Sequence, residues 1–172
     1  MSLAPRHGPT VFTTPSDREL AVARSFDAPR PLVFTVWTSP EHVRRWMRGP
    51  DGWTMPVCEI DLRPGGSWRH VWRHADGTER ALSGVYREVE PPIQILGTGH
   101  WESGRAETPI TVYFTVDDGL TIVKTKVLYP SREARDAGRA SSVTGDAVAS
   151  LDRLAAYLRP LNEDGNAVLS PP

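Results

Sequence analysis

The sequence predicts an α+β domain in which an antiparallel sheet of six to seven strands packs against one long C-terminal helix. From about Trp53 to Tyr129 apolar and polar residues alternate, which is typical of strands with one buried face. From about Val143 to Leu158 apolar residues recur every three or four positions, as on one face of a helix. Glycine-containing turns between the alternating segments indicate that consecutive strands form hairpins.

The N-terminal part is predicted as a flexible leader, a strand and two short helices. Residues 1–17 carry three prolines and no periodic apolar pattern, so we expect a loosely attached leader. Arg18–Asp27 alternates as a strand does. Apolar residues at helical spacing then predict a helix from about Pro31 to Thr38 and a second helix for which Ser39 is the candidate cap.

The segment Asp61–Trp68 marks the point where the helical part gives way to the sheet. Its Pro64 restricts the backbone, and the two glycines that follow can adopt the positive φ angles of a tight hairpin turn. A phosphate-binding loop is the alternative, but no helix pattern follows and the Lys-Ser or Lys-Thr pair of such loops is missing. We therefore interpret the segment as the turn that opens the sheet.

Turn sequences divide the chain into its strands. We predict strands at about 18–27, 55–62, 68–74, 79–88, 93–101, 108–116 and 120–129. The strand at 93–101 contains Gly97 and Gly99, which weaken a strand unless a bulky group lies close by.

The C-terminal part is predicted as a helical turn, a long helix and a tail. Ser131 can cap a brief turn that Gly138 interrupts. The long helix follows, and we expect Pro160 to end it. Residues 18–160 then form a single domain, and residues 161–172 form a flexible tail.

Composition limits the classes of partner. The chain carries 20 basic and 21 acidic side chains, so its formal charge of −1 indicates neither nucleic acid nor an anionic membrane as a partner. The sole cysteine, Cys58, cannot form an internal disulfide, and no secretory leader or membrane-spanning apolar run is present, so we expect a cytoplasmic protein. Six tryptophans are compatible with an aromatic-lined cavity and equally with a filled core.

Four segments resemble the SRPBCC (START-like) superfamily, in particular its AHSA-type branch, named after an activator of a heat-shock-protein ATPase, and its polyketide cyclase-like proteins. They are Phe34–Trp46, Asp61–Trp68, Gly84–Pro92 and Ser150–Leu158. The resemblance implies a helix-grip fold, in which a curved sheet surrounds the long helix and leaves a deep, mostly apolar cavity. It implies hydrophobic small molecules such as lipids or polyketides as ligands, while some members are cyclases or other enzymes.

Two departures from the family pattern concern that cavity. Asp146 stands where the resemblance implies a large indole facing the cavity; alternatively its carboxylate faces solvent on the first helical turn, where the helix dipole favours it. Gly97 and Gly99 stand where bulkier residues are usual. Both departures would enlarge the cavity or make it more polar.

His70 is the candidate residue for chemistry, because it lies between Trp68 and Trp72 on one strand face. A buried imidazole could hydrogen-bond a ligand hydroxyl or carbonyl, or act as a general base. Alternatively His70 is a hydrogen-bonded core residue, or the register differs by one and the face points outward. The predicted ligand-binding residues are Trp68, His70, Trp72, Tyr86, Trp101, Phe114 and Asp146.

The sequence predicts neither a metal nor a cofactor. His70 and His74 are four residues apart, which on a strand is roughly 13 Å and too far to share one ion. Cys58 has no recognisable base beside it. We expect a binding protein for a hydrophobic or aromatic small molecule; the alternatives are a cofactor-independent cyclase or dehydratase using His70 or Asp146, and an interaction module like the chaperone-ATPase activators. The chain could also form a homodimer.

Overall fold

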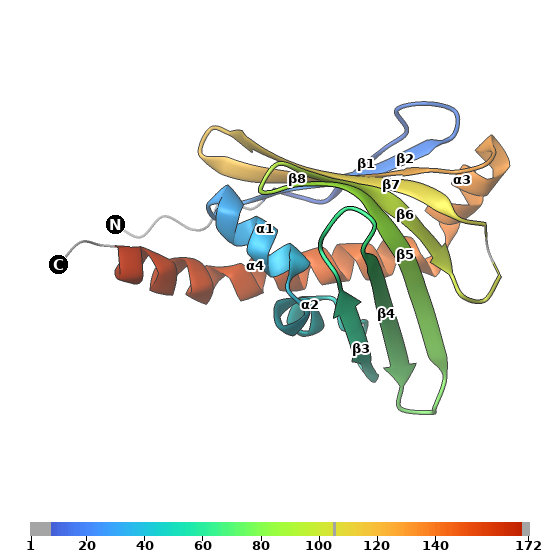
Figure 1. Ribbon diagram of the computed structural model, residues 1–172, viewed down its shortest axis with the longest axis horizontal. Coiled ribbons are helices and arrows are strands. Elements are labelled where there is room, and N and C mark those ends of the chain that lie inside the picture. Colours follow the sequence, from blue (N-terminus) through green and yellow to red (C-terminus); the bar gives the residue numbers. More distant parts are fainter. Residues whose placement is uncertain (1–7, 105, 170–172) are drawn as a thin grey trace.

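The computed structural model describes residues 8–104 and 106–169, which form one antiparallel sheet of eight strands and four helices (Figure 1). The strands are β1 (Val11–Thr13), β2 (Glu19–Phe26), β3 (Trp53–Ile60), β4 (Ser67–His74), β5 (Glu79–Glu90), β6 (Gln94–Trp101), β7 (Thr108–Asp117) and β8 (Leu120–Leu128). The helices are α1 (Arg30–Thr38), α2 (Pro40–Trp46), α3 (Arg132–Ala140) and α4 (Ser142–Leu169). The strands lie in the order β1-β2-β8-β7-β6-β5-β4-β3, so β1 adds an eighth strand to the predicted six or seven.

The sheet bends around α4, which crosses its concave side, and α1 and α2 lie beside the same helix (Figure 1). The sheet, the two short helices and α4 share one core. Its fully buried side chains include Phe26, Val33, Trp46, Phe114 and Leu154. Burial of such side chains contributes about 1.5–3 kcal/mol each. The predicted helix-grip arrangement is therefore confirmed. None of the described helices combines the length and apolar character needed to cross a membrane.

The register of β4 confirms the predicted strand face. Ring centroids of Trp68 and His70 are 5.1 Å apart, and those of His70 and Trp72 are 5.8 Å apart, so the three side chains lie on the same side of the strand. His70 is only 9% exposed, which shows that this side faces the interior. The alternative of a register shifted by one residue is wrong.

Glycines in β5 and β6 make room for the indole of Trp68. Gly84 and Gly99 are paired across the two strands. A Cβ atom on Gly99 would lie 3.2 Å from Cζ2 of Trp68, and one on Gly84 would collide with the carbonyl oxygen of Thr98. The bulky group expected near the glycine-rich strand is thus Trp68, and it fills the space that we expected Gly99 to add to the cavity.

Helix ends agree only partly with the sequence. Ser131 caps α3 as predicted, because its side chain accepts a hydrogen bond from the backbone N–H of Ala134 at 3.0 Å. Ser39 precedes α2, but its side chain caps no described N–H group. Gly138 lies inside α3 instead of interrupting it, and its missing side chain lets the phenol of Tyr129 approach the helix.

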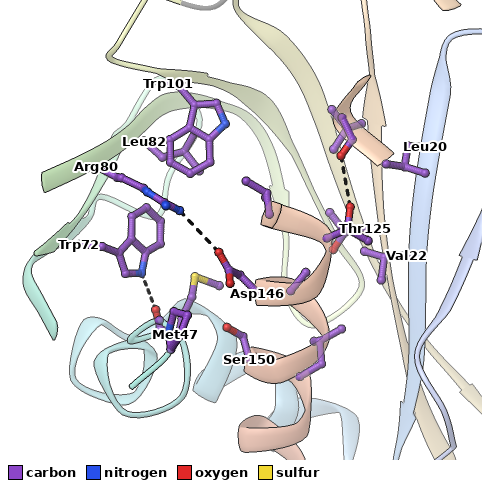
Figure 2. A pocket seen from close by; sticks show the side chains of 18 of the residues that line it. Leu20, Val22, Met47, Trp72, Arg80, Leu82, Trp101, Thr125, Asp146 and Ser150 are labelled. Atoms are coloured by element: carbon purple, nitrogen blue, oxygen red, sulfur yellow. Dashed lines mark hydrogen bonds and ion pairs between the residues drawn. The ribbon is translucent and has the colours of Figure 1, made fainter. Parts of the chain in front are cut away.

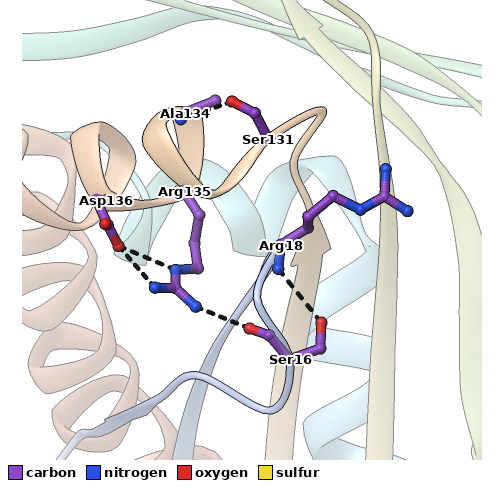
Figure 3. Close-up of polar contacts among 6 residues, drawn as sticks. All are labelled: Ser16, Arg18, Ser131, Ala134, Arg135 and Asp136. Carbon is purple, nitrogen blue, oxygen red and sulfur yellow. Dashed lines mark hydrogen bonds and ion pairs between the residues drawn. The ribbon is translucent and has the colours of Figure 1, made fainter.

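The segments expected to be flexible are ordered over much of their length. Within the predicted leader, Val11–Thr13 pairs with β2. Arg135, which is 8% exposed, donates one hydrogen bond of 2.8 Å to the carbonyl oxygen of Ser16 and two to Asp136, which fastens the connection between β1 and β2 to α3 (Figure 3). Residues 1–7 of the predicted leader lie outside the described residues.

Helix α4 passes through Pro160 and continues to Leu169, so the predicted tail is wrong over 161–169. Proline removes one intrahelical hydrogen bond, which ordinarily ends a helix. Here Leu161 packs on the core and the side chain of Asn162 donates to the carbonyl oxygen of Asp27 at 3.2 Å, so tertiary contacts hold the helix beyond the proline. Residues 170–172 lie outside the described residues.

Candidate functional site

Two adjoining cavities lie against the sheet. The larger lies between the sheet, the two short helices and α4, and the smaller lies between the sheet and the end of α1. The larger has a volume of about 330 Å³ and the smaller about 210 Å³; we call them the large and the small compartment. Trp37, Met47, Leu82 and Thr125 line both. The compartments are therefore neighbours that share a wall.

All six tryptophans of the chain line one compartment or both. Trp37, Trp46, Trp53, Trp72 and Trp101 line the large compartment, and Trp37 and Trp68 line the small one. Aliphatic side chains complete the large compartment, including Leu20, Val22 and Leu82 (Figure 2). The high tryptophan content of the chain is therefore explained by the cavity walls. Trp46 contributes to a wall and also packs into the core.

Polar contacts fix two sides of the large compartment (Figure 2). The indole N–H of Trp72 donates to the carbonyl oxygen of Met47 at 2.6 Å, which holds the ring against Trp101. Arg80 lies 3.6 Å from a carboxylate oxygen of Asp146, and its guanidinium carbon lies 4.8 Å from the ring centroid of Trp53. The Arg80 and Asp146 side chains are 45% and 34% exposed, so this pair contributes at most about 1 kcal/mol.

The small compartment is uncharged. Its walls are mainly apolar and aromatic side chains. Besides the tryptophans, the neutral polar side chains that line it are Thr38, His70, Tyr86, Thr98 and, on the shared wall, Thr125. Burial lowers the pKa of His70 from 6.5 to about 4, so the imidazole is neutral at pH 7. Burial also raises the pKa of Tyr86 well above its ordinary value. Both groups therefore offer hydrogen bonds without charge.

The Nε2 atom of His70 is buried and has no hydrogen-bond partner among the described residues. On the neighbouring strand Cys58 stands directly opposite His70, and burial raises the pKa of its thiol to about 11. A thiol with that pKa is protonated at pH 7 and is a poor nucleophile. Chemistry at this position thus rests on the imidazole.

Six of the seven predicted site residues line a compartment. Trp68, His70 and Tyr86 line the small one, and Trp72, Trp101 and Asp146 line the large one. Asp146 is therefore at the cavity, although a third of its side chain is exposed. Phe114 lines neither: it is fully buried against Phe34 and Trp37, with ring centroids at 5.0 and 6.0 Å, because α1 covers its face of β7. That placement in the cavity is wrong.

Arg80 was not predicted as a site residue. It lies on the same face of β5 as Leu82 and Tyr86, so extending the two-residue period by one step would have reached it. Trp37 and Met47, which line both compartments, come from α1 and the end of α2. Within the described part of the chain, no three His, Cys, Asp or Glu side chains come together as a set that could hold a metal ion.

Comparison with known proteins identifies a family and several similar structures. A family model described as Activator of Hsp90 ATPase homolog 1-like protein matches residues 27–159. A solved structure from Rhodobacter sphaeroides is 27% identical, has a TM-score of 0.84 and covers 89% of this chain and 99% of its own. Protein Ms6760 from Mycobacterium smegmatis is 22% identical, with a TM-score of 0.76 and coverage of 87% and 97%. No curated protein matched.

An AHSA1-like protein from Aeromonas hydrophila is 19% identical, with a TM-score of 0.64 and coverage of 82% of this chain and 93% of its own. At such identities the Mycobacterium and Aeromonas structures support the fold alone. The family model spans most of the chain, including the two short helices, the sheet from β3 to β8 and most of α4. The resemblance seen in the sequence is confirmed, and the protein belongs to the Activator of Hsp90 ATPase homolog 1-like family of the SRPBCC superfamily.

Proposed function

We propose that the protein binds a hydrophobic small molecule with cyclic or aromatic character, of lipid or polyketide type, in the two compartments. The observation that carries this proposal is that all six tryptophans line one apolar cavity system. Pockets for small molecules typically enclose 300–1,000 Å³ and combine apolar walls with a few polar groups, which agrees with the large compartment at about 330 Å³.

Catalysis is less well supported than binding. A general base works best with a pKa near the operating pH, and burial keeps the pKa of His70 at about 4. Asp146 lines the other compartment and is paired with Arg80. A cyclase or dehydratase would need one of these groups to move a proton, and Nε2 of His70 has no orienting partner among the described residues.

An interaction module would bury its aromatic side chains in a collapsed core and expose an apolar patch. The open compartments favour a ligand over that alternative.

Native mass spectrometry of the protein purified from its own host tests the proposal. Wild-type protein should carry a small-molecule adduct, and Ala147→Trp, which places an indole in the large compartment, should lose it. Ala156→Trp is the matched control, because Ala156 lies on the exposed side of the same helix. A wild-type protein that is free of ligand after gentle purification, and that also fails to bind hydrophobic probes in equilibrium dialysis, would contradict the proposal.

A further inference from the structure

The side chain of His70 is the part of the cavity whose hydrogen-bonding capacity is left unused. It is 9% exposed and lines the small compartment, while its Nε2 atom has no partner among the described residues. Buried polar atoms in folded proteins nearly always have a partner, so an exception calls for an explanation. The neighbouring compartment offers one, since a bound molecule could supply the missing group.

The surroundings hold this imidazole beside the compartment. Trp68 and Trp72 flank it on the same strand, and Cys58 and Leu82 stand opposite it on the adjacent strands. The ring therefore stays at the compartment wall. Rotation about the Cβ–Cγ bond of histidine is soft, so small turns of the ring toward a ligand cost little.

The ligand group that fits here is uncharged. No side chain that lines the small compartment carries a formal charge, and His70 itself is neutral. Moving a carboxylate or an ammonium group into such surroundings without a charged partner is very costly. Charged ends of a ligand would stay near Arg80 and Asp146 in the large compartment.

A hydroxyl group satisfies His70 in either tautomer. If Nε2 carries the proton it donates to the hydroxyl oxygen, and if Nδ1 carries it Nε2 accepts from the hydroxyl O–H. A carbonyl group would satisfy only the first case. Tyr86 and Thr98 line the same compartment and add further neutral hydrogen-bonding groups.

We propose that the small compartment binds the uncharged hydroxyl group, alcohol or phenol, of an otherwise apolar ligand, with His70 as its hydrogen-bond partner. This inference rests on the proposed function and specifies the ligand class. The large compartment would then hold the apolar body of the same molecule, since the two compartments share the wall formed by Trp37, Met47, Leu82 and Thr125.

Equilibrium dialysis with naphthalene, 2-naphthol and 2-naphthoate tests the inference. In wild-type protein 2-naphthol should bind more tightly than naphthalene, whereas 2-naphthoate, whose carboxylate would stay near Arg80, should bind equally well to wild type and His70→Leu. The ratio of the naphthalene to the 2-naphthol dissociation constant should fall about 3- to 10-fold in His70→Leu, the size expected for one hydrogen bond. His70→Gln, which keeps a donor and an acceptor, should retain part of the preference, and His42→Leu, which lies outside both compartments, should leave the ratio unchanged.

The outcomes separate the inference from the function. Naphthalene binding in each variant reports an intact cavity, so a misfolded variant is recognised by its loss. If naphthalene and 2-naphthol bind with the same ratio of dissociation constants in wild type and His70→Leu, the role of His70 is overturned and the binding function stands. A 2-naphthoate affinity that falls in His70→Leu as much as that of 2-naphthol would overturn the uncharged hydroxyl. Absence of binding for all three probes in wild type would overturn both.

Discussion

Replacing His70 by leucine should stabilise the ligand-free protein. A buried polar atom without a partner costs about 1–3 kcal/mol, and leucine fills a similar volume with no polar atom. Since Nε2 of His70 has no partner among the described residues, His70→Leu should raise the free energy of unfolding by about 1–2 kcal/mol at about pH 7.5. For a chain of this length that corresponds to a melting temperature higher by roughly 2–8 °C.

The advantage of His70→Leu should widen in acid. The pKa of His70 is lowered from 6.5 to about 4, so the unfolded chain takes up a proton in a range where the folded protein does not. Stability of the wild type therefore falls as the pH drops from 6.5 to about 4. At about pH 5 this proton uptake costs the wild type about 2 kcal/mol, which the leucine variant avoids.

Urea unfolding followed by circular dichroism at both pH values measures the two effects. Acidic groups that also titrate are common to both proteins, so they cancel in the difference between variant and wild type. His42→Leu is the control: His42 Nδ1 lies 2.7 Å from the hydroxyl of Tyr157, and losing that bond should destabilise the protein. A His70→Leu variant that is less stable than wild type at about pH 7.5, or a difference that stays constant on acidification, would refute the reasoning.

Three further substitutions test individual contacts by the same unfolding assay. Trp72→Phe removes the 2.6 Å bond to Met47 and should cost about 1 kcal/mol; an unchanged midpoint would mean that the bond adds nothing. Gly84→Ala drives a Cβ into the carbonyl oxygen of Thr98 and should cost about 1–3 kcal/mol, whereas wild-type stability would show that the strands can move apart. Arg135→Leu removes the link from α3 to the β1–β2 connection, so hydrogen exchange there should accelerate while β6 and β7 stay protected; equal exchange in both proteins would contradict this role.

The faces of the strands could be predicted from the sequence, because the alternation of side chains along a strand is strict. That rule places Trp68, His70 and Trp72 together once the hairpin at Pro64 sets the start of the sheet. It could not place Phe114. Alternation says that a face is buried, but whether α1 or a cavity covers it depends on how the helices pack.

The ends of the domain were predicted less well for a related reason. Pro160 and the proline-rich N-terminal segment are local signals of chain termination and flexibility. Contacts from distant parts of the chain outweigh them: Asn162 reaches Asp27, and Arg135 reaches Ser16. Such contacts leave no periodic pattern in the sequence.

The distribution of the tryptophans also determines what the intrinsic fluorescence of the protein can measure. Each of the six indoles lies on a compartment wall, so the ultraviolet emission of the protein originates almost entirely from the lining of its cavity. A bound molecule that absorbs in the range of indole emission would take up energy from several of them at once. The tryptophans can therefore report the binding of such a molecule without an added label.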